Sequence, residues 1–578
     1  MVKHRQVLSL RSCSLHAVPK LVKENIVRAA HATQSSWYRV FTGDFEVSSD
    51  KIVDNYIIKF REYILQHVIW TDREEVFKLV MKGMEDGFLQ VRKSWRPDKD
   101  HTQYSKVLEA VSKFTDVLKW PKLNKLDFGD VPRTMRSRIL ELIPQFLNLS
   151  TLIIGPGSSG GWIPIKGAAA LHLSCSISEL KQLQIFSLKK DCTMDILSAV
   201  VLNSGTTLRV LDVENSKRIC SDSVPVILQC SHLVELNIYG TKINDESKAR
   251  LIMGLPKLRH LTRADFLCDA LGWIDYLEEL EDPVFDIREF MPSQSYYFHE
   301  TWQLEIVSRM CPRIEKMLFI HHRDTCPSLL PISDLKHLTD LQLHGGHWTS
   351  SEMDKLIQAV GGRLHNLGLI SVKGLDIFSL KAIFSVCDNL NGIVFNNCDF
   401  SSQFGGVHVV EKVCKLKELV LTSNTREEYT AWLLRAGINL KIIHLGCSTH
   451  VTDSLILQAL ENGCLKNLQE LQVERSPDLS LVTVHALLSG CPNLKSLGDL
   501  GAWGRVTGAE LGEIRQIVHA QNLDLDLSSH QVLRRFLGLQ QEERQSMLNL
   551  LTGPVLERIR IAQTAARNEQ ENFPDDEE

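Results

Sequence analysis

The sequence predicts an α/β solenoid, a horseshoe of short strand-and-helix units stacked along one direction, behind an α-helical N-terminal cap domain. Three observations predict this fold. An apolar pattern of the form L-x-x-L-x-L recurs along most of the 578 residues, its recurrences are mostly 24 to 28 residues apart, and apolar residues at helical spacing follow it. One strand and one helix cannot bury their own apolar faces, so such units are stable only when stacked on copies of themselves.

Residues 468–497 show the unit most clearly. Leucine or valine at the first, fourth and sixth places favours a short strand, because side chains in a strand alternate between core and surface. A Ser-Pro-Asp break follows, and apolar residues then recur at helical spacing over 482–488. Gly490 and Pro492 predict the end of this helix, since glycine is a natural stop and proline cannot continue a helix.

The same pattern predicts the other strands. Its first residue recurs at Leu123, Leu149, Leu183, Leu208, Leu233, Leu258, Ile314, Leu338, Leu364, Leu390, Leu416, Leu440, Leu468 and Leu494. The step from Leu258 to Ile314 is about twice a repeat, which predicts a degenerate unit near residues 284–287. Residues 523–527 are predicted to form a last strand. The solenoid should place its strands on the concave wall and its helices outside.

Cysteines mark the ends of several units. Cys230, Cys311, Cys387 and Cys491 each stand three residues before the next opening residue. In this respect the chain resembles the cysteine-containing, ribonuclease-inhibitor-like class of leucine-rich repeats, as found in F-box/leucine-rich-repeat proteins. The resemblance implies protein recognition, often the selection of substrates for ubiquitin ligases. We interpret these cysteines as buried, reduced thiols at helix ends, with a raised pKa.

Regions outside the repeats predict three further segments. Residues 1–115 hold amphipathic stretches and a capping-box pattern at Thr71 and Glu74, so we expect a helical N-terminal domain. It should cover the open end of the solenoid, which spans residues 116–530. Residues 531–567 should form C-terminal capping helices, with Leu533, Phe536 and Leu537 among the residues covering the last strand. Residues 568–578 read as a disordered acidic tail.

Composition narrows the class of protein. Apolar residues make up 44% of the chain and charged residues 23%, which is ordinary for a globular protein. A net charge of −5 gives no basic field for nucleic acid. No apolar run approaches the ~20 residues that span a bilayer, and the first ten residues lack a signal-peptide core. We therefore expect a cytoplasmic or nuclear protein that binds neither nucleic acid nor membrane.

No motif predicts catalysis, a metal or a cofactor. Gly-x-Ser-x-Gly, His-Glu-x-x-His and the phosphate-binding loop are all absent, and the glycine-rich stretch 155–161 has no Lys-Ser/Thr pair after it. The pairs His321 with His322 and His344 with His347 lack zinc-ligand spacing. We predict that the protein is not an enzyme.

Two interpretations fit the aromatic-rich region 261–312. Its large side chains, among them Trp273, Tyr276 and Trp302, either fill the core of a degenerate repeat or form an exposed insertion that contacts a partner.

The concave wall is the predicted partner-binding surface. Side chains at the third, fifth and seventh places of the pattern should face outward from the core. Carboxylates at these places are Asp127, Asp212, Glu214, Glu235, Asp340, Glu418, Glu470 and Glu474. Their excess over lysines favours a basic or polar protein segment as ligand, whereas each one alone also fits an ordinary solvated strand.

An adaptor-binding motif is predicted at the N-terminus. Leu10, Ser14 and Val18 lie four residues apart along one helix face, and with Ser9 they resemble the elongin-binding box of cullin-ligase substrate receptors. The same residues also fit core packing, and Val18-Pro19 fits a divergent F-box that lacks the expected glutamate. The resemblance implies a substrate-recognition subunit of a cullin-type ubiquitin ligase, with an elongin or Skp-type adaptor and a cullin as partners. The alternative is a leucine-rich-repeat scaffold outside any ligase.

Overall fold

The computed structural model describes most of the repeat region. The described residues are 17–28, 123–127, 143–155, 167–277, 283–292, 300–321, 328–400, 415–447, 449–498 and 500–527, with 140, 165 and short runs between 58 and 90. The chain divides into two compact units. We call Gln6–His365 the N-terminal unit, and we call the other, which comprises Met1–Arg5 and Asn366–Glu578, the C-terminal unit.

The N-terminal unit contains short parallel strands that pair in chain order. These strands are β1 (Lys125–Asp127), β2 (Thr151–Ile154), β3 (Ile185–Leu188), β4 (Val210–Asp212), β5 (Glu235–Asn237), β6 (His260–Leu261), β7 (Glu289–Phe290), β8 (Lys316–Ile320) and β9 (Asp340–His344). Strands β1 to β6 form one sheet, and β7 begins a second sheet that continues through β8 and β9. Parallel pairing requires a crossover after every strand, which the helices supply.

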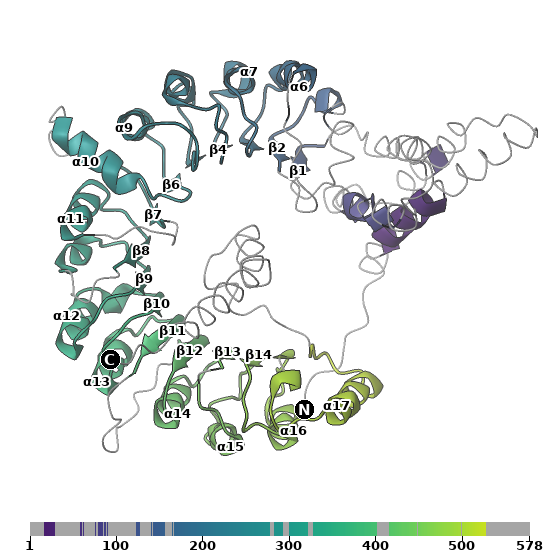
Figure 1. Ribbon diagram of the computed structural model, residues 1–578, viewed down its shortest axis with the longest axis vertical. Helices are drawn as coiled ribbons and strands as arrows, with labels where there is room; N and C mark the ends of the chain where they lie inside the picture. Colours follow the sequence, from purple (N-terminus) through teal and green to yellow (C-terminus); the bar gives the residue numbers. More distant parts are fainter. Residues whose placement is uncertain are drawn as a thin grey trace, which may run out of the picture. The chain divides into compact units, whose positions relative to one another are not determined.

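The helices between the strands of this unit lie on one side of the strands (Figure 1). They are α6 (Ala168–Ser178), α7 (Met194–Ser204), α8 (Val224–Ile227), α9 (Asp245–Gly254), α10 (Leu267–Leu277), α11 (Thr301–Met310) and α12 (Ser350–Val360). Short 3₁₀ helices also occur, namely η4 (Ile143–Gln145), η5 (Ser221–Ser223), η6 (Leu330–Asp334) and η7 (Gly361–Arg363). The apolar stripes of the α-helices pack on the sheet, and the opposite side of the sheet carries no described helix.

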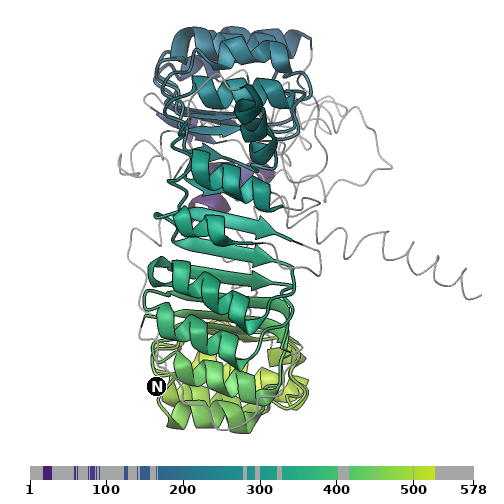
Figure 2. The same cartoon turned by 90° about the vertical axis from the view of Figure 1, so that its left-hand side faces the viewer.

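The C-terminal unit repeats this arrangement. Its parallel strands are β10 (Asn366–Ile370), β11 (Gly392–Asp399), β12 (Glu418–Asn424), β13 (Ile442–Leu445), β14 (Glu470–Val473) and β15 (Ser496–Gly498). Its helices are α13 (Ile377–Val386), α14 (Glu427–Ala436), α15 (Asp453–Glu461), α16 (Leu481–Gly490) and α17 (Gly508–Ala520), with the 3₁₀ turn η8 (Leu500–Ala502). Figure 2 shows several of these helices side by side. The predicted alternation of parallel strands and helices is confirmed.

The register of the repeats also agrees with the sequence pattern. Every predicted opening residue, from Leu123 to Leu494, is at most 2% exposed, and each stands two residues before the first residue of its strand. The degenerate unit is confirmed as well, because Ile287 is buried and stands two residues before β7.

Two irregularities depart from the expected series. Strand β6 has only two residues, and Arg263 adopts a φ of 53°, a left-handed conformation that takes the chain out of the strand. The sheet ends there. The predicted last strand at 523–527 is reduced to a single bridge between Ser496 and Asp526, because the chain pairs with β15 only at that point.

The four repeat-end cysteines lie where their spacing predicts. Cys311, Cys387 and Cys491 are the C-cap residues of α11, α13 and α16, and Cys230 follows α8. All four side chains are buried, and burial raises the pKa of each thiol to about 12. The interpretation of these residues as buried thiols is confirmed.

A close helix contact lies near the start of the N-terminal unit. The helix at 17–28 buries Val18, Val22 and Ile26. A Cβ on Gly83 would come within 2.6 Å of the Pro19 carbonyl oxygen, so only glycine allows this approach.

No helix within the described ranges is both long and apolar enough to cross a membrane.

Candidate protein-interaction surface on the strands

We call the side of each sheet opposite its helices the strand face. In every repeat it presents the third, fifth and seventh residues of the pattern, which form rows across neighbouring strands. The parallel register aligns these rows: Asp212 of β4 stands beside Ser187 of β3 and Asn237 of β5. Side chains from three separate repeats therefore meet at one place.

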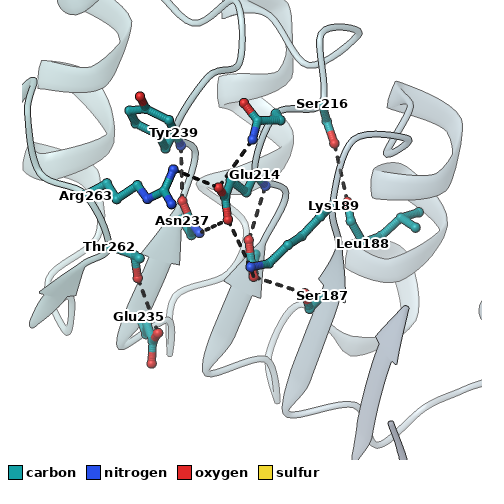
Figure 3. Close-up of polar contacts among 12 residues, drawn as sticks. Ser187, Leu188, Lys189, Glu214, Ser216, Glu235, Asn237, Tyr239, Thr262 and Arg263 are labelled. Carbon is teal, nitrogen blue, oxygen red and sulfur yellow. Dashed lines mark hydrogen bonds and ion pairs between the residues drawn. The ribbon is translucent and has the colours of Figure 1, made fainter. Parts of the chain in front are cut away.

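A polar cluster is built around Glu214 on the strand face of the N-terminal unit (Figure 3). The Glu214 side chain is 3% exposed. Its carboxylate lies 2.9 Å from the Lys189 ammonium and 3.1 Å from the Arg263 guanidinium. Asn215 and Asn237 each donate a side-chain N–H to it over 3.3 Å. A buried carboxylate is stable only when it is paired and hydrogen-bonded in this way.

Asp212 extends the cluster along β4. Its carboxylate accepts a hydrogen bond from Ser187 Oγ at 3.0 Å and from the backbone N–H of Glu214 at 3.1 Å, and Lys189 Nζ lies 3.7 Å away. Burial raises the pKa of Asp212 above its ordinary value, while Lys189 and these hydrogen bonds act in the opposite direction. Lys189 therefore stabilises two carboxylates at once.

Tyr239 contacts the cluster on its other side. The Arg263 guanidinium lies 4.8 Å from the centre of the Tyr239 ring, a cation–π contact. Arg263 comes after the two-residue strand β6, and its backbone is left-handed where its side chain takes this position. Lys189 and Arg263 balance Asp212 and Glu214 in charge. The cluster offers a partner fixed hydrogen-bonding groups rather than a net charge.

The other predicted carboxylates occupy separate places on the strand faces. In the N-terminal unit, Glu235 accepts a hydrogen bond from Thr262 at 3.4 Å and Asp340 accepts one from Thr339 at 2.7 Å, while Asp127 lies on β1. In the C-terminal unit, Glu418 and Glu470 lie on β12 and β14, and Glu474 follows β14. The structure thus brings Asp212 and Glu214 into one cluster and distributes the rest.

The C-terminal unit has a less polar strand face. The fifth residues of its repeats form the middle row of this face. In it the register places Val394, Val420, His444 and Gln472 side by side. His444 Nε2 lies 2.9 Å from Glu474 Oε1. This hydrogen bond lowers the pKa of the Glu474 carboxyl, and burial acts against it.

A second charged cluster was not identified from the sequence. Asp286 lies within 3.2 Å of the guanidinium groups of Arg259, Arg288 and Arg313. The pKa of Asp286 is lowered, because hydrogen bonds from Arg313 and Arg259 outweigh partial burial. Arg259 follows the opening residue Leu258 by one place, whereas Arg313 precedes the opening residue Ile314, so the two arginines have no common register position that could have indicated the cluster. Asp286, in the degenerate unit, lacked a secure register.

The aromatic region is exposed in part. Trp273, Tyr276 and Trp302 are 42%, 79% and 45% exposed, and the rings of Trp273 and Tyr276 make an edge contact with centroids 6.3 Å apart. These three side chains do not fill the core, so the core-filling interpretation is wrong for them.

The predicted adaptor box is described only at its last position. Val18 is 9% exposed and shares its buried stripe with Val22 and Ile26. Leu10 and Ser14 lie outside the described residues.

No group of three or more His, Cys, Asp or Glu side chains that could hold a metal ion occurs in the part of the chain that the structure describes.

The parallel strands, the helices between them and the buried opening residues are features of a leucine-rich-repeat (LRR) fold. No family model matches the chain. Over 149 residues it is 30% identical to F-box/LRR-repeat protein 4 of Bos taurus, a match that covers 25% of this chain and 24% of that protein. The chain therefore aligns with about a quarter of the length of this curated relative. A solved LRR protein structure from Leptospira interrogans covers 72% of this chain and 92% of its own, with a TM-score of 0.37 and 15% identity.

Proposed function

We propose that this protein recognises a protein partner through the strand faces of its repeats, as the substrate-recognition subunit of a cullin-type ubiquitin ligase. The observation that supports recognition of a protein partner is the cluster around Glu214. Its side chains come from four successive repeats and hold one another in fixed positions before any partner arrives. Such preorganisation reduces the entropy that binding costs.

The ligase role draws its support from two resemblances. One is the similarity of a 149-residue segment to an F-box/LRR-repeat protein. The other is the N-terminal pattern of Leu10, Ser14 and Val18, which resembles an elongin-binding box. The burial of Val18 favours the alternative, an LRR scaffold outside any ligase, because a residue that packs in the core offers little surface to an adaptor.

Binding of purified adaptors to the full chain separates the two candidates. The intact protein, a Leu10→Glu/Ser14→Glu variant and a Glu470→Lys/Glu474→Lys variant are each tested against an elongin complex and a Skp-type adaptor. The ligase role predicts that the intact chain binds one adaptor, that an elongin interaction is lost in the first variant only, and that the second variant keeps it. If neither adaptor binds the intact chain, the scaffold function replaces the ligase function.

A further inference from the structure

The strand face of the C-terminal unit is buried where an open sheet would be exposed. In the middle row, Val394 is 6% exposed, Val420 is not exposed, and His444 and Gln472 are 1% and 4% exposed. Beside this row, Ile442 is 9% exposed and completes a buried apolar cluster with the two valines. A side chain on an uncovered sheet face keeps its outer atoms in contact with water. A further group therefore lies over this row.

The described helices of this unit cannot provide that cover. Helices α13 to α17 lie on the opposite side of the sheet (Figure 1). Two buried polar atoms of the same row, His444 Nδ1 and Gln472 Oε1, make no hydrogen bond. An unsatisfied buried polar atom is destabilising, so these two atoms favour a covering group that can donate or accept hydrogen bonds.

Carboxylates border the apolar row. Glu418 and Glu470 lie in the row on one side, and Glu474 lies on the other. An apolar strip edged by carboxylates fits an amphipathic segment that carries basic residues next to its apolar stripe.

We propose that residues 532–551 of this chain occupy the strand face over β11 to β14. Leu533, Phe536 and Leu537 have the i, i+3, i+4 spacing of an apolar helix face, and Arg534 and Arg535 adjoin them. The described chain ends at residue 527, beside β15, where Asp526 bridges to Ser496.

This segment can reach the proposed position. From β15 to β11 the sheet spans roughly 19 Å at about 4.8 Å per strand. A helix of twenty residues is about 30 Å long. The chain after residue 527 is therefore long enough to lie along the row.

The segment would then compete with a partner for the same surface, a consequence that rests on the proposed function. The docking itself does not depend on any partner, and it is tested without one.

A thiol placed in the row reports whether the segment covers it. In the full chain, Val420→Cys is alkylated and followed by mass spectrometry, with the exposed Cys447 as the fast internal standard and the buried Cys491 as the slow one. We expect Val420→Cys to react as slowly as Cys491. Adding Phe536→Asp/Leu537→Asp should speed it by more than about tenfold, a factor that corresponds to ~1.4 kcal/mol. Arg534→Glu/Arg535→Glu should speed it as well.

Control variants show whether a change in the alkylation rate depends on the segment itself. Asp575→Asn/Asp576→Asn, in the tail beyond the segment, should leave the rate unchanged. Val394→Cys serves as the reporter if Val420→Cys lowers the melting temperature. A rate equal to that of Cys447 in the parent chain, or a slow rate that survives both segment variants, overturns the proposal. Protection that disappears on dilution also overturns it, because the covering group would then be a second copy.

Discussion

Glu214 shows at the level of a single residue what the strand face requires. Its carboxylate is buried, so it loses most of its hydration, and four side chains compensate for that loss. Removing one partner of a buried ion pair leaves an uncompensated charge, which costs more than the pair contributes. The first role of the two cations in the cluster is therefore to stabilise the fold, and any role in binding comes second.

Lys189→Met should destabilise the N-terminal unit by about 1–3 kcal/mol, because Asp212 and Glu214 lose their shared counter-charge while Glu214 keeps Arg263. Denaturant unfolding measures this loss. Glu214→Gln in the Lys189→Met background should recover part of it, since the remaining charge is then removed. Equal stability of Lys189→Met and the parent would mean that the cluster is hydrated in solution.

The sequence located some of this cluster and missed the rest for a physical reason. Asp212 and Glu214 were predicted on the strand face from the alternation of side chains along β4. Arg263 was missed because the chain leaves the strand at a left-handed residue, where the alternation no longer applies. Its contact with Glu214 joins residues about fifty positions apart, and spacing within one repeat cannot indicate such a pairing.

At the scale of elements, the L-x-x-L-x-L pattern predicted the first residues of the strands more accurately than their last residues. Opening leucines are buried in every repeat, so the core fixes the first residues of each strand. Strand length depends instead on the neighbouring strand. The predicted last strand at 523–527 therefore kept one bridge, since β15 has three residues and offers little to pair with.

The helix ends carry the second prediction, which concerns thiol reactivity. Cys230, Cys311, Cys387 and Cys491 should react slowly with iodoacetamide in the native protein, because burial limits access and raises their pKa to about 12, leaving little thiolate at pH 8. Cys175 and Cys447 are exposed and should react quickly in the same sample. Comparable rates for the two groups, read peptide by peptide, would contradict buried helix ends.

These thiols also make stability depend on pH in the alkaline range. Their pKa in the folded state lies above the ordinary value of 9.0, so the unfolded chain loses these protons first. Their contribution to the free energy of unfolding is complete below pH 9 and falls as the pH rises above it.

Within each unit the repeats are stacked, and each repeat packs mainly on its two neighbours. In such a stack, stability is close to a sum of repeat and interface terms, and a local defect need not unfold distant repeats. The chain forms two compact units, and each has its own series of buried leucines. Leu211 of β4 and Leu419 of β12 are equivalent residues, both fully buried, in different units.

Leu211→Ala and Leu419→Ala should each cost about 2–5 kcal/mol, because each removes buried methyl groups and leaves a cavity. Hydrogen–deuterium exchange should show where this loss falls. We expect Leu211→Ala to speed exchange in β3, β4 and β5 and Leu419→Ala to speed it in β11, β12 and β13, with the other unit little changed in each case. A rise of equal size throughout both units would show that the chain unfolds as one cooperative body, since a defect in one repeat would then reach every other repeat.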